Sequence, residues 1–208
     1  LMLQNTAVVA VLATLGVLFS SSLVAYAFAR LNFAGRDRLF LLLLATMMLP
    51  GIVTMIPTYV LFAKLGWVNS FKPLVLPAWF GGGAFNIFLL RQFYLGLPRE
   101  LDEAAFLDGA SHWTIFSRIV LPLSGPALAT VGIFAFMFNW KDFMGPLLYL
   151  NDPDLMTNEI GLSTYNAIQA SKWHLIAAGS VMVMLPIIVI FFLGQRYFVK
   201  GLAMTGGK

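Results

Sequence analysis

The residues that could do chemistry gather in one segment, residues 91–118, which carries seven charged side chains in 28 residues. Three acids follow Pro98 almost at once, namely Glu100, Asp102 and Glu103. Proline is favourable at the first position of a helix, and negative charge is favourable in the first turn because it faces the positive end of the helix dipole. The spacing therefore predicts a short helix that begins at Pro98 and carries acids on its surface.

A second short helix is expected directly after the first. Gly109 suits the left-handed residue that ends a helix, and Ser111 suits the N-cap of the next one. Leu121-Pro122 then leads into a long apolar run. We expect residues 98–121 to form a helix-turn-helix elbow.

The residue types of this elbow are those of a docking surface. Ala104 and Ala105 are expected to be exposed, and their small side chains would let another protein come close beside the acids Glu103 and Asp108. The alternative is an ordinary solvated helix, in which Glu103 pairs with Arg99 one turn earlier for a few tenths of a kcal/mol. Because exposed pairs of this kind contribute so little, docking is the favoured interpretation.

The sequence does not favour catalysis or a nucleotide site on this chain. It has no cysteine, and its two histidines, His112 and His174, are expected at opposite sides of a membrane. There is no His-Glu-x-x-His pattern, and the terminal Gly-Gly-Lys lacks the glycine spacing and the following Ser or Thr of a phosphate loop. We predict no metal site, no catalytic residue and no bound cofactor.

The elbow lies among long uncharged runs that predict membrane-spanning helices. The chain is 60% apolar and 11% charged, against about 25% charged residues in an ordinary soluble domain. Each run is close to or above the roughly 20 residues that a helix needs to cross a bilayer. The predicted fold class is an all-α polytopic membrane protein, a single domain over 1–208 with five helices and a polar extracytoplasmic loop at 142–173. The helices are expected at about 6–30, 38–64, 72–95, 122–141 and 174–198.

The basic residues predict the orientation of these helices. All seven arginines, and nine of the thirteen basic residues, fall on the side that carries the elbow and the C-terminus. The positive-inside rule assigns that side to the cytoplasm, so the basic pI reflects topology and not a nucleic-acid partner. Five spans with a cytoplasmic C-terminus place the N-terminus outside, and the first residue is Leu1. We therefore expect that at least one further helix precedes this chain.

Glycine and proline mark irregular places in two of the runs. Pro50, Gly51 and Pro57 predict two kinks in one helix, because each proline removes an intrahelical hydrogen bond. The triplet Gly81, Gly82 and Gly83 predicts a loosened helix or a close approach to a neighbouring backbone. Irregular backbone at membrane depth persists where it is buried in protein or lines a wet cavity, which favours these two helices as a translocation path. The alternative is that glycine and proline are simply more common in membrane helices.

A possible substrate path is indicated by polar side chains near aromatic ones. Asn139 and Asp142 would share a helix face near the outer end of a span, beside Trp140, and Asn86 follows the glycine triplet. Amides and carboxylates bind hydroxyls, and aromatic faces pack on the C–H face of a sugar ring. The alternative for Trp140 is ordinary placement in the aromatic belt of the membrane interface.

One segment of the elbow resembles a known signature. Glu103-Ala104-Ala105, then Gly109, then Ile119-x-Leu121-Pro122 is similar to the EAA signature of permease subunits in binding-protein-dependent ATP-binding-cassette (ABC) importers. The spacing and the place, two spans before the C-terminus, both match. Further segments resemble the carbohydrate branch, of which the maltose-type permease is the familiar member: 25–30, 33–36, 91–93, 108–110, 139–143, 195–198 and 201–202.

The resemblance implies a fold, partners and a mechanism. The fold would be that of a type I ABC importer permease, usually with six helices, in the bacterial cytoplasmic membrane. The partners would be a second permease subunit, two ATPase subunits that bind ATP and Mg, and an extracytoplasmic solute-binding protein. The coupling residues would be Glu103, Ala104, Ala105, Asp108, Gly109, Leu121 and Pro122. Closure of the ATPase dimer would then rotate the membrane helices, and a sugar would cross by alternating access.

Other functions remain open at this point. A related importer could carry a non-sugar solute such as glycerol phosphate. A secondary transporter would need internal repeats and an ionisable residue within the membrane. The five uncharged runs, 7–29, 39–63, 73–90, 119–140 and 175–195, show neither. An integral-membrane enzyme would need clustered His, Asp or Glu at one membrane face, and the acids of the elbow are already assigned to docking.

Overall fold

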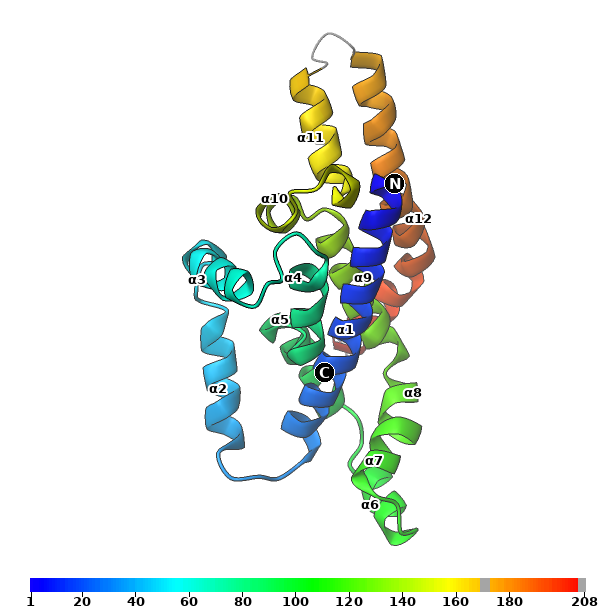
Figure 1. The fold of residues 1–208 in the computed structure, drawn as a ribbon. Coiled ribbons are helices and arrows are strands. Elements are labelled where there is room, and N and C mark those ends of the chain that lie inside the picture. The colour runs from blue at the N-terminus through cyan, green and yellow to red at the C-terminus, as the bar shows by residue number, and fades with distance from the viewer. Residues whose placement is uncertain (169–172, 206–208) are drawn as a thin grey trace.

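The computed structural model describes residues 1–168 and 173–205, and over these ranges the chain is built from helices and their connections. The long helix α1, Met2–Arg30, runs through the middle of the bundle (Figure 1). It packs along its length against α5, Ala84–Leu95, and α9, Gly125–Trp140. Close packing is possible because the buried face of α1 is made of small residues: Ala10, Ala13, Gly16, Ser20, Ser21, Ser22, Ala25 and Ala29.

The helix predicted over 38–64 is two helices. Helix α2 covers Arg36–Thr46 and α3 covers Gly51–Lys64, and their axes differ by 98°. Pro50 is extended and precedes α3, while Pro57 lies within α3. The predicted kinks in a continuous helix were therefore wrong, because the helix is broken at Pro50-Gly51. Proline has no N–H to donate the hydrogen bond that would continue the helix.

The predicted helix over 72–95 is interrupted at the glycine triplet. Helix α4, Lys72–Val75, continues into the 3-10 helix η1, Leu76–Phe80, and α5 begins at Ala84. Gly82 and Gly83 have φ of +59° and +85°, which favour glycine. A Cβ on Gly82 would lie 2.7 Å from Ser21 Cβ and 2.8 Å from the Ser21 backbone nitrogen. The close approach to a neighbouring backbone is confirmed, and the neighbour is α1.

The elbow lies at one end of the helix bundle and projects away from it (Figure 1). It contains α6, Glu100–Leu107, then α7, His112–Ile115, then the π-helical turn η2, Phe116–Val120, and α8, Leu121–Leu123. The segment His112–Leu123 meets α9 at 78°. The helix predicted over 122–141 is therefore divided at Ser124, where Gly125-Pro126 starts a new helix.

The segment predicted as a polar loop, 142–173, is largely helical at the opposite end of the molecule. It contains α10, Met144–Tyr149, the 3-10 helix η3, Pro153–Leu155, and α11, Asn158–Ile168. Helix α11 packs against α12, Trp173–Thr205, and both extend past the start of α1 (Figure 1). Asn5 holds this end by donating from Nδ2 to the carbonyls of Asp154 and Met156, at 2.8 and 3.0 Å.

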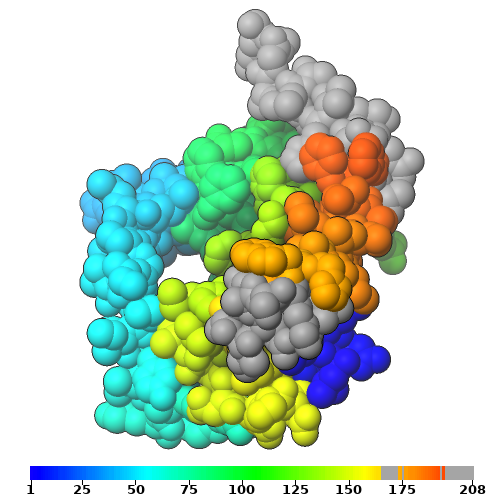
Figure 2. Space-filling model, turned by 90° about the horizontal axis from the view of Figure 1, so that it is seen from above, coloured from blue at the N-terminus to red at the C-terminus, as the bar shows by residue number. Residues whose placement is uncertain are grey.

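Helices α2 and α3 stand at one flank of the molecule. Seen from above in Figure 2, the cyan residues of α3 and α4 lie along one side, with the yellow residues of α10 next to them. Most large apolar side chains of α3 are exposed: Ile52, Val53, Ile56, Val60 and Leu61. This flank therefore presents an apolar surface that the described part of the chain does not cover.

Two described helical segments, α1 and residues 72–95, are long and apolar enough to cross a membrane. Counting each bent pair, α2 with α3 and 112–123 with α9, as one span raises the number to four. Within the described part of α12, a shorter apolar stretch runs over Ile176–Phe192. Five spans remain a prediction.

Candidate functional site

The turn of the elbow has the geometry that the sequence predicts. Gly109 has φ of +80°, and the Ala110 N–H donates to the carbonyl of Ala105 at 2.9 Å. Ser111 caps α7, because its Oγ accepts the N–H of Thr114 at 3.2 Å. The first helix begins two residues later than expected, at Glu100, with Arg99 as its N-cap. Two short helices are thus joined at a fixed turn.

The outer surface of the elbow is acidic, small and partly apolar. Glu103, Ala104, Asp108 and Gly109 are exposed. Ala105, which was expected to be exposed with Ala104, is buried, because helical periodicity turns it toward a core cluster that includes Ile115 and Phe116. The exposed face therefore carries one alanine of the pair, and the other fixes α6 to the rest of the molecule.

Sequence reasoning missed three large apolar side chains on this surface. Leu107 is 90% exposed, Trp113 is 62% exposed and Phe106 is 44% exposed. Large apolar side chains on a surface helix gain nothing from exposure to water. Exposed apolar patches often mark contact sites with another protein. The signal that could have found them is the pair Phe106-Leu107 directly before the glycine that ends the helix.

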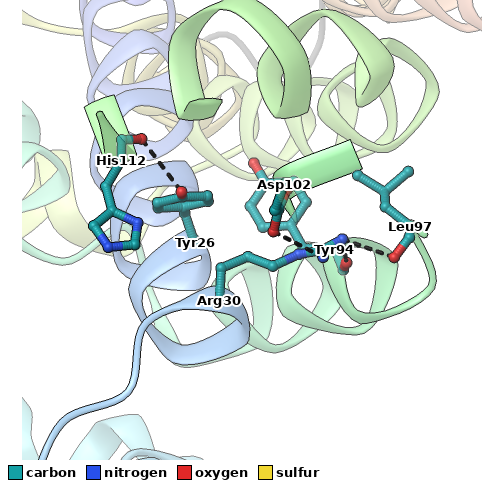
Figure 3. A network of polar contacts seen from close by, with 6 residues as sticks. All are labelled: Tyr26, Arg30, Tyr94, Leu97, Asp102 and His112. Atoms are coloured by element: carbon teal, nitrogen blue, oxygen red, sulfur yellow. Dashed lines mark hydrogen bonds and ion pairs between the residues drawn. The ribbon is translucent and has the colours of Figure 1, made fainter. Parts of the chain in front are cut away.

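Glu103 does not form the weak local pair considered as its alternative role. Among the described residues the ion pairs are Arg30–Asp102 and Arg36–Asp37, so Glu103 remains unpaired on the surface. Asp102, its neighbour in the chain, makes the inward contact. Asp102 Oδ2 lies 3.0 Å from Arg30 Nη1, at the end of α1 (Figure 3).

The remaining coupling positions lie where the elbow joins α9. Leu121 is half-buried against the core cluster, and Pro122 is exposed within α8. Pro122 lies near the end of the continuous helical segment 112–123, directly after the π-helical turn η2. These two residues begin the rigid connection that continues into the bundle.

The residues of the predicted substrate path do not meet in one polar site. Asn139 Nδ2 donates to the carbonyl of Ala135 in its own helix, at 2.7 Å. Trp140 is buried, and its Nε1 donates to the carbonyl of Val183 in α12 at 3.0 Å. Asn86 Nδ2 donates to the Gly82 carbonyl at 2.7 Å, across the start of α5.

Asp142 lies beyond the end of α9 and does not share a helix face with Asn139. Its Oδ1 accepts the N–H of Gly145 at 3.1 Å, at the start of α10. The carboxyl is partly buried, and burial raises its pKa, although the backbone N–H groups of Gly145 and Met144 oppose the rise. An open hollow surrounds it, lined by Met137, Phe138, Lys141, Asp142, Phe143 and Met144.

An aromatic cluster close to Asp142 was not foreseen. The rings of Tyr59 and Tyr149 stack with centroids 6.0 Å apart, and Phe62 packs against Tyr149 at 5.5 Å. Burial raises the pKa of the Tyr149 hydroxyl, and the nearby Asp142 carboxyl raises it further. These residues come from helices far apart in sequence, so local patterns could not bring them together.

Among the described residues, no three His, Asp or Glu side chains gather in a way that could hold a metal ion. The site that the structure offers is therefore the elbow: a protein-sized surface with an exposed acid, an exposed alanine and exposed apolar side chains on a fixed turn.

Almost the whole chain is similar to proteins of known function. Residues 14–204 match the family described as the binding-protein-dependent transport system inner membrane component. The arabinooligosaccharides transport system permease protein AraQ of Halalkalibacterium halodurans is 41% identical over 198 residues, which is 95% of this chain and 70% of that protein. The sn-glycerol-3-phosphate transport system permease protein UgpE of Pectobacterium atrosepticum is 38% identical over 97% of this chain and 72% of its own.

A solved structure shows the same fold. A chain of a bacterial ABC transporter involved in the import of the acidic polysaccharide alginate superimposes with a TM-score of 0.83 and 23% identity. The superposition covers 95% of this chain and 74% of that chain. Taken together, the match over 14–204 and the relatives above 30% identity show that this chain belongs to the inner membrane component family of binding-protein-dependent transport systems.

Proposed function

We propose that this chain is a permease subunit of an ATP-driven importer and that it carries a sugar across the bacterial cytoplasmic membrane. The observation that supports this most is the exposed surface of the elbow, where Glu103 and Ala104 lie beside Leu107 on a fixed turn. Such a surface is better suited to contact with a protein partner than to exposure to water. In this proposal the partner is a cytoplasmic ATPase subunit, and that subunit binds the ATP and Mg.

The partners follow from the mechanism. The complex would contain a second permease subunit, two ATPase copies and an extracytoplasmic solute-binding protein. The exposed apolar flank of α2 and α3 suits lipid and the second permease. The elbow and the C-terminus would face the cytoplasm, where the positive-inside rule places all seven arginines.

The solute would pass near the end that carries α10. Asp142 lines an open hollow together with Phe138 and Phe143, which is the combination of a carboxylate and aromatic rings that a sugar needs. Asn86 and Asn139 remain candidates for this path from α5 and α9, and the buried Trp140 would support it by fixing α9 to α12. Gly82, Gly83 and Pro50 would supply the breaks about which the helices move.

The experiment that tests the proposal is purification of the intact complex from its native membrane. The permease should copurify with a second permease and an ATPase, and a sugar-loaded binding protein should stimulate ATP hydrolysis. Uptake driven by an ion gradient without ATP would overturn the proposal.

Glycerol phosphate is a second candidate solute, because a relative that is 38% identical is named for sn-glycerol-3-phosphate transport. Thermal stabilisation of the cognate binding protein by a panel of sugars and glycerol phosphate separates the two. Stabilisation by glycerol phosphate alone would replace the sugar assignment and leave the ATP-driven mechanism in place.

A further inference from the structure

The end of α1 contacts both helices of the elbow. Helix α1 ends at Arg30, whereas the elbow begins near residue 98, so no short covalent connection joins them. Arg30 Nη1 nevertheless lies 3.0 Å from Asp102 Oδ2 in α6, and the two side chains are only 4% and 15% exposed. A charge pair so well shielded from water is screened little by salt, and loss of one partner would leave the other charge buried without compensation.

The same guanidinium also holds the connection that leads into the elbow. Arg30 Nη2 donates to the carbonyls of Tyr94, at 2.7 Å, and Leu97, at 2.8 Å. The Leu97 carbonyl lies just beyond α5, where backbone acceptors lack intrahelical partners, and the Tyr94 carbonyl in its last turn also accepts the Leu97 N–H at 3.2 Å. Arg30 therefore joins α1, the end of α5 and α6 through one planar group, a geometry that the fork of arginine donors suits and a lysine does not.

A second contact reaches the other side of the turn. Tyr26, one helical turn before Arg30, donates its hydroxyl to the carbonyl of His112 at 3.2 Å. Its ring packs on Phe116 with centroids 5.2 Å apart. Residues four apart lie on the same face of a helix, so one face of α1 holds α6 and α7 on either side of Gly109 (Figure 3).

From these contacts we infer that Arg30 and Tyr26 are positioning residues for coupling, and that movement of the elbow is delivered directly to α1 through the Arg30–Asp102 pair. The inference rests on the proposed function. Asp102 and Glu103 are adjacent in α6, yet Glu103 is exposed to a docking partner while the Asp102 side chain, 15% exposed, faces Arg30 of α1. A displacement of α6 by its partner is thereby passed to the helix that packs against both α5 and α9.

The test is the number of ATP molecules hydrolysed per solute carried by the intact complex in proteoliposomes. Asp102→Asn keeps an oxygen acceptor but removes the charge. We expect the variant to retain its ATPase subunits and most of its ATP hydrolysis while uptake falls roughly tenfold, a coupling loss of the size typical between linked sites. Tyr26→Phe keeps the ring on Phe116 and should shift the ratio in the same direction by a smaller factor. Arg30→Lys should restore the ratio in part relative to Arg30→Ala.

The matched control is Asp37→Asn, which removes the other ion pair, between Arg36 and Asp37. That pair is exposed, with side chains 26% and 76% accessible, so its loss should leave the ratio unchanged. A merely structural role for Asp102 predicts that ATP hydrolysis and uptake fall together with the amount of folded complex. That result, or an unchanged ratio, would overturn the inference.

Failure of the inference can be distinguished from failure of the proposed function. If Glu103→Lys leaves ATPase binding and transport intact, the elbow is no docking site and the proposed function fails together with the inference. If Glu103→Lys loses the ATPase while Asp102→Asn keeps a normal ratio, the docking site stands and only the role of Arg30 and Tyr26 is refuted.

Discussion

Asp102 and Glu103 are neighbours in α6 with opposite roles: the Asp102 carboxylate lies 3.0 Å from Arg30 with its side chain 15% exposed, while Glu103 is exposed and unpaired among the described residues. One acid of the pair fixes α6 to the molecule, and the other is available to a partner. This division explains why acids at consecutive positions of one short helix are not redundant.

Reversing the charge at the exposed position should weaken docking without unfolding the chain. Glu103→Lys is expected to lower the affinity for the ATPase subunit by roughly thirtyfold, about 2 kcal/mol, which is the lower end for disrupting a charged group in an interface. Copurification of the ATPase from detergent-solubilised membranes measures it. Asp154→Lys, an equal charge change at the exposed opposite end, should have no effect, and equal losses in both variants would refute specific docking.

The turn of the elbow should depend on the backbone of Gly109 and not on space around it. A Cβ at Gly109 would have no atom within 4 Å, but φ is +80°. Gly109→Ala should therefore cost about 1 kcal/mol of backbone strain, and Gly109→Asn should cost less because asparagine tolerates this conformation. The thermal unfolding midpoint of the purified complex measures this loss of stability. Gly125→Ala is the control, because a Cβ at Gly125 would also meet no atom within 4 Å and Gly125 has no positive φ. An unfolding midpoint of Gly109→Ala equal to that of Gly125→Ala would contradict the predicted backbone strain.

The contact between α1 and the glycine triplet should be far less tolerant. Gly82→Ala places a Cβ 2.8 Å from the backbone nitrogen of Ser21, and backbone cannot move aside as a flexible side chain does. We expect a loss on the order of 3 kcal/mol from overpacking and the positive φ together, seen as a lower yield and a lower unfolding midpoint. Gly81→Ala meets no atom within 4 Å and should behave like the parent. Similar behaviour of the two variants would show that the close approach is absent.

The stability of the α10 end should depend on pH through Asp142. Burial raises the pKa of this carboxyl above its ordinary 3.8, so between the two values the folded state binds more protons than the unfolded state. The contribution of Asp142 is thus fully present below 3.8 and is lost as pH rises through the raised value. Asp142→Asn keeps an oxygen for the Gly145 N–H and carries no charge. Its unfolding midpoint should exceed that of the parent at pH 7, and the gap should close toward pH 4; a gap independent of pH would contradict this.

Local signals predicted the elbow well. Gly109 and Ser111 act within a few residues of themselves, so their types indicate the turn and the cap before any tertiary structure is known. Pro50-Gly51 indicated an irregular place in the helix, although a kink was expected there and the structure has a break. The 98° between α2 and α3 could not be predicted, because it depends on which surfaces the two halves pack against.

Long-range contacts account for what the sequence did not indicate. Arg30 and Asp102 are separated by 72 positions, and no spacing rule joins a helix end to an acid that far away. The helices of 142–168 were hidden for a similar reason. The end of η3 and the start of α11 are held by Asn5 and Thr6 at the start of α1, where the Thr6 hydroxyl accepts the Asn158 N–H at 2.9 Å. Ala105 was assigned to the wrong face because the short helix around it has no strong apolar stripe to show its orientation.

The most direct measurement is solute uptake by proteoliposomes that contain the complete complex, with ATP inside or absent and with the loaded binding protein outside or absent. Uptake should require both ATP and the binding protein, and Glu103→Lys should lower it sharply while the chain remains inserted in the membrane. Uptake that proceeds on an ion gradient without ATP, or that continues at the parental rate in Glu103→Lys, would contradict coupling through the elbow.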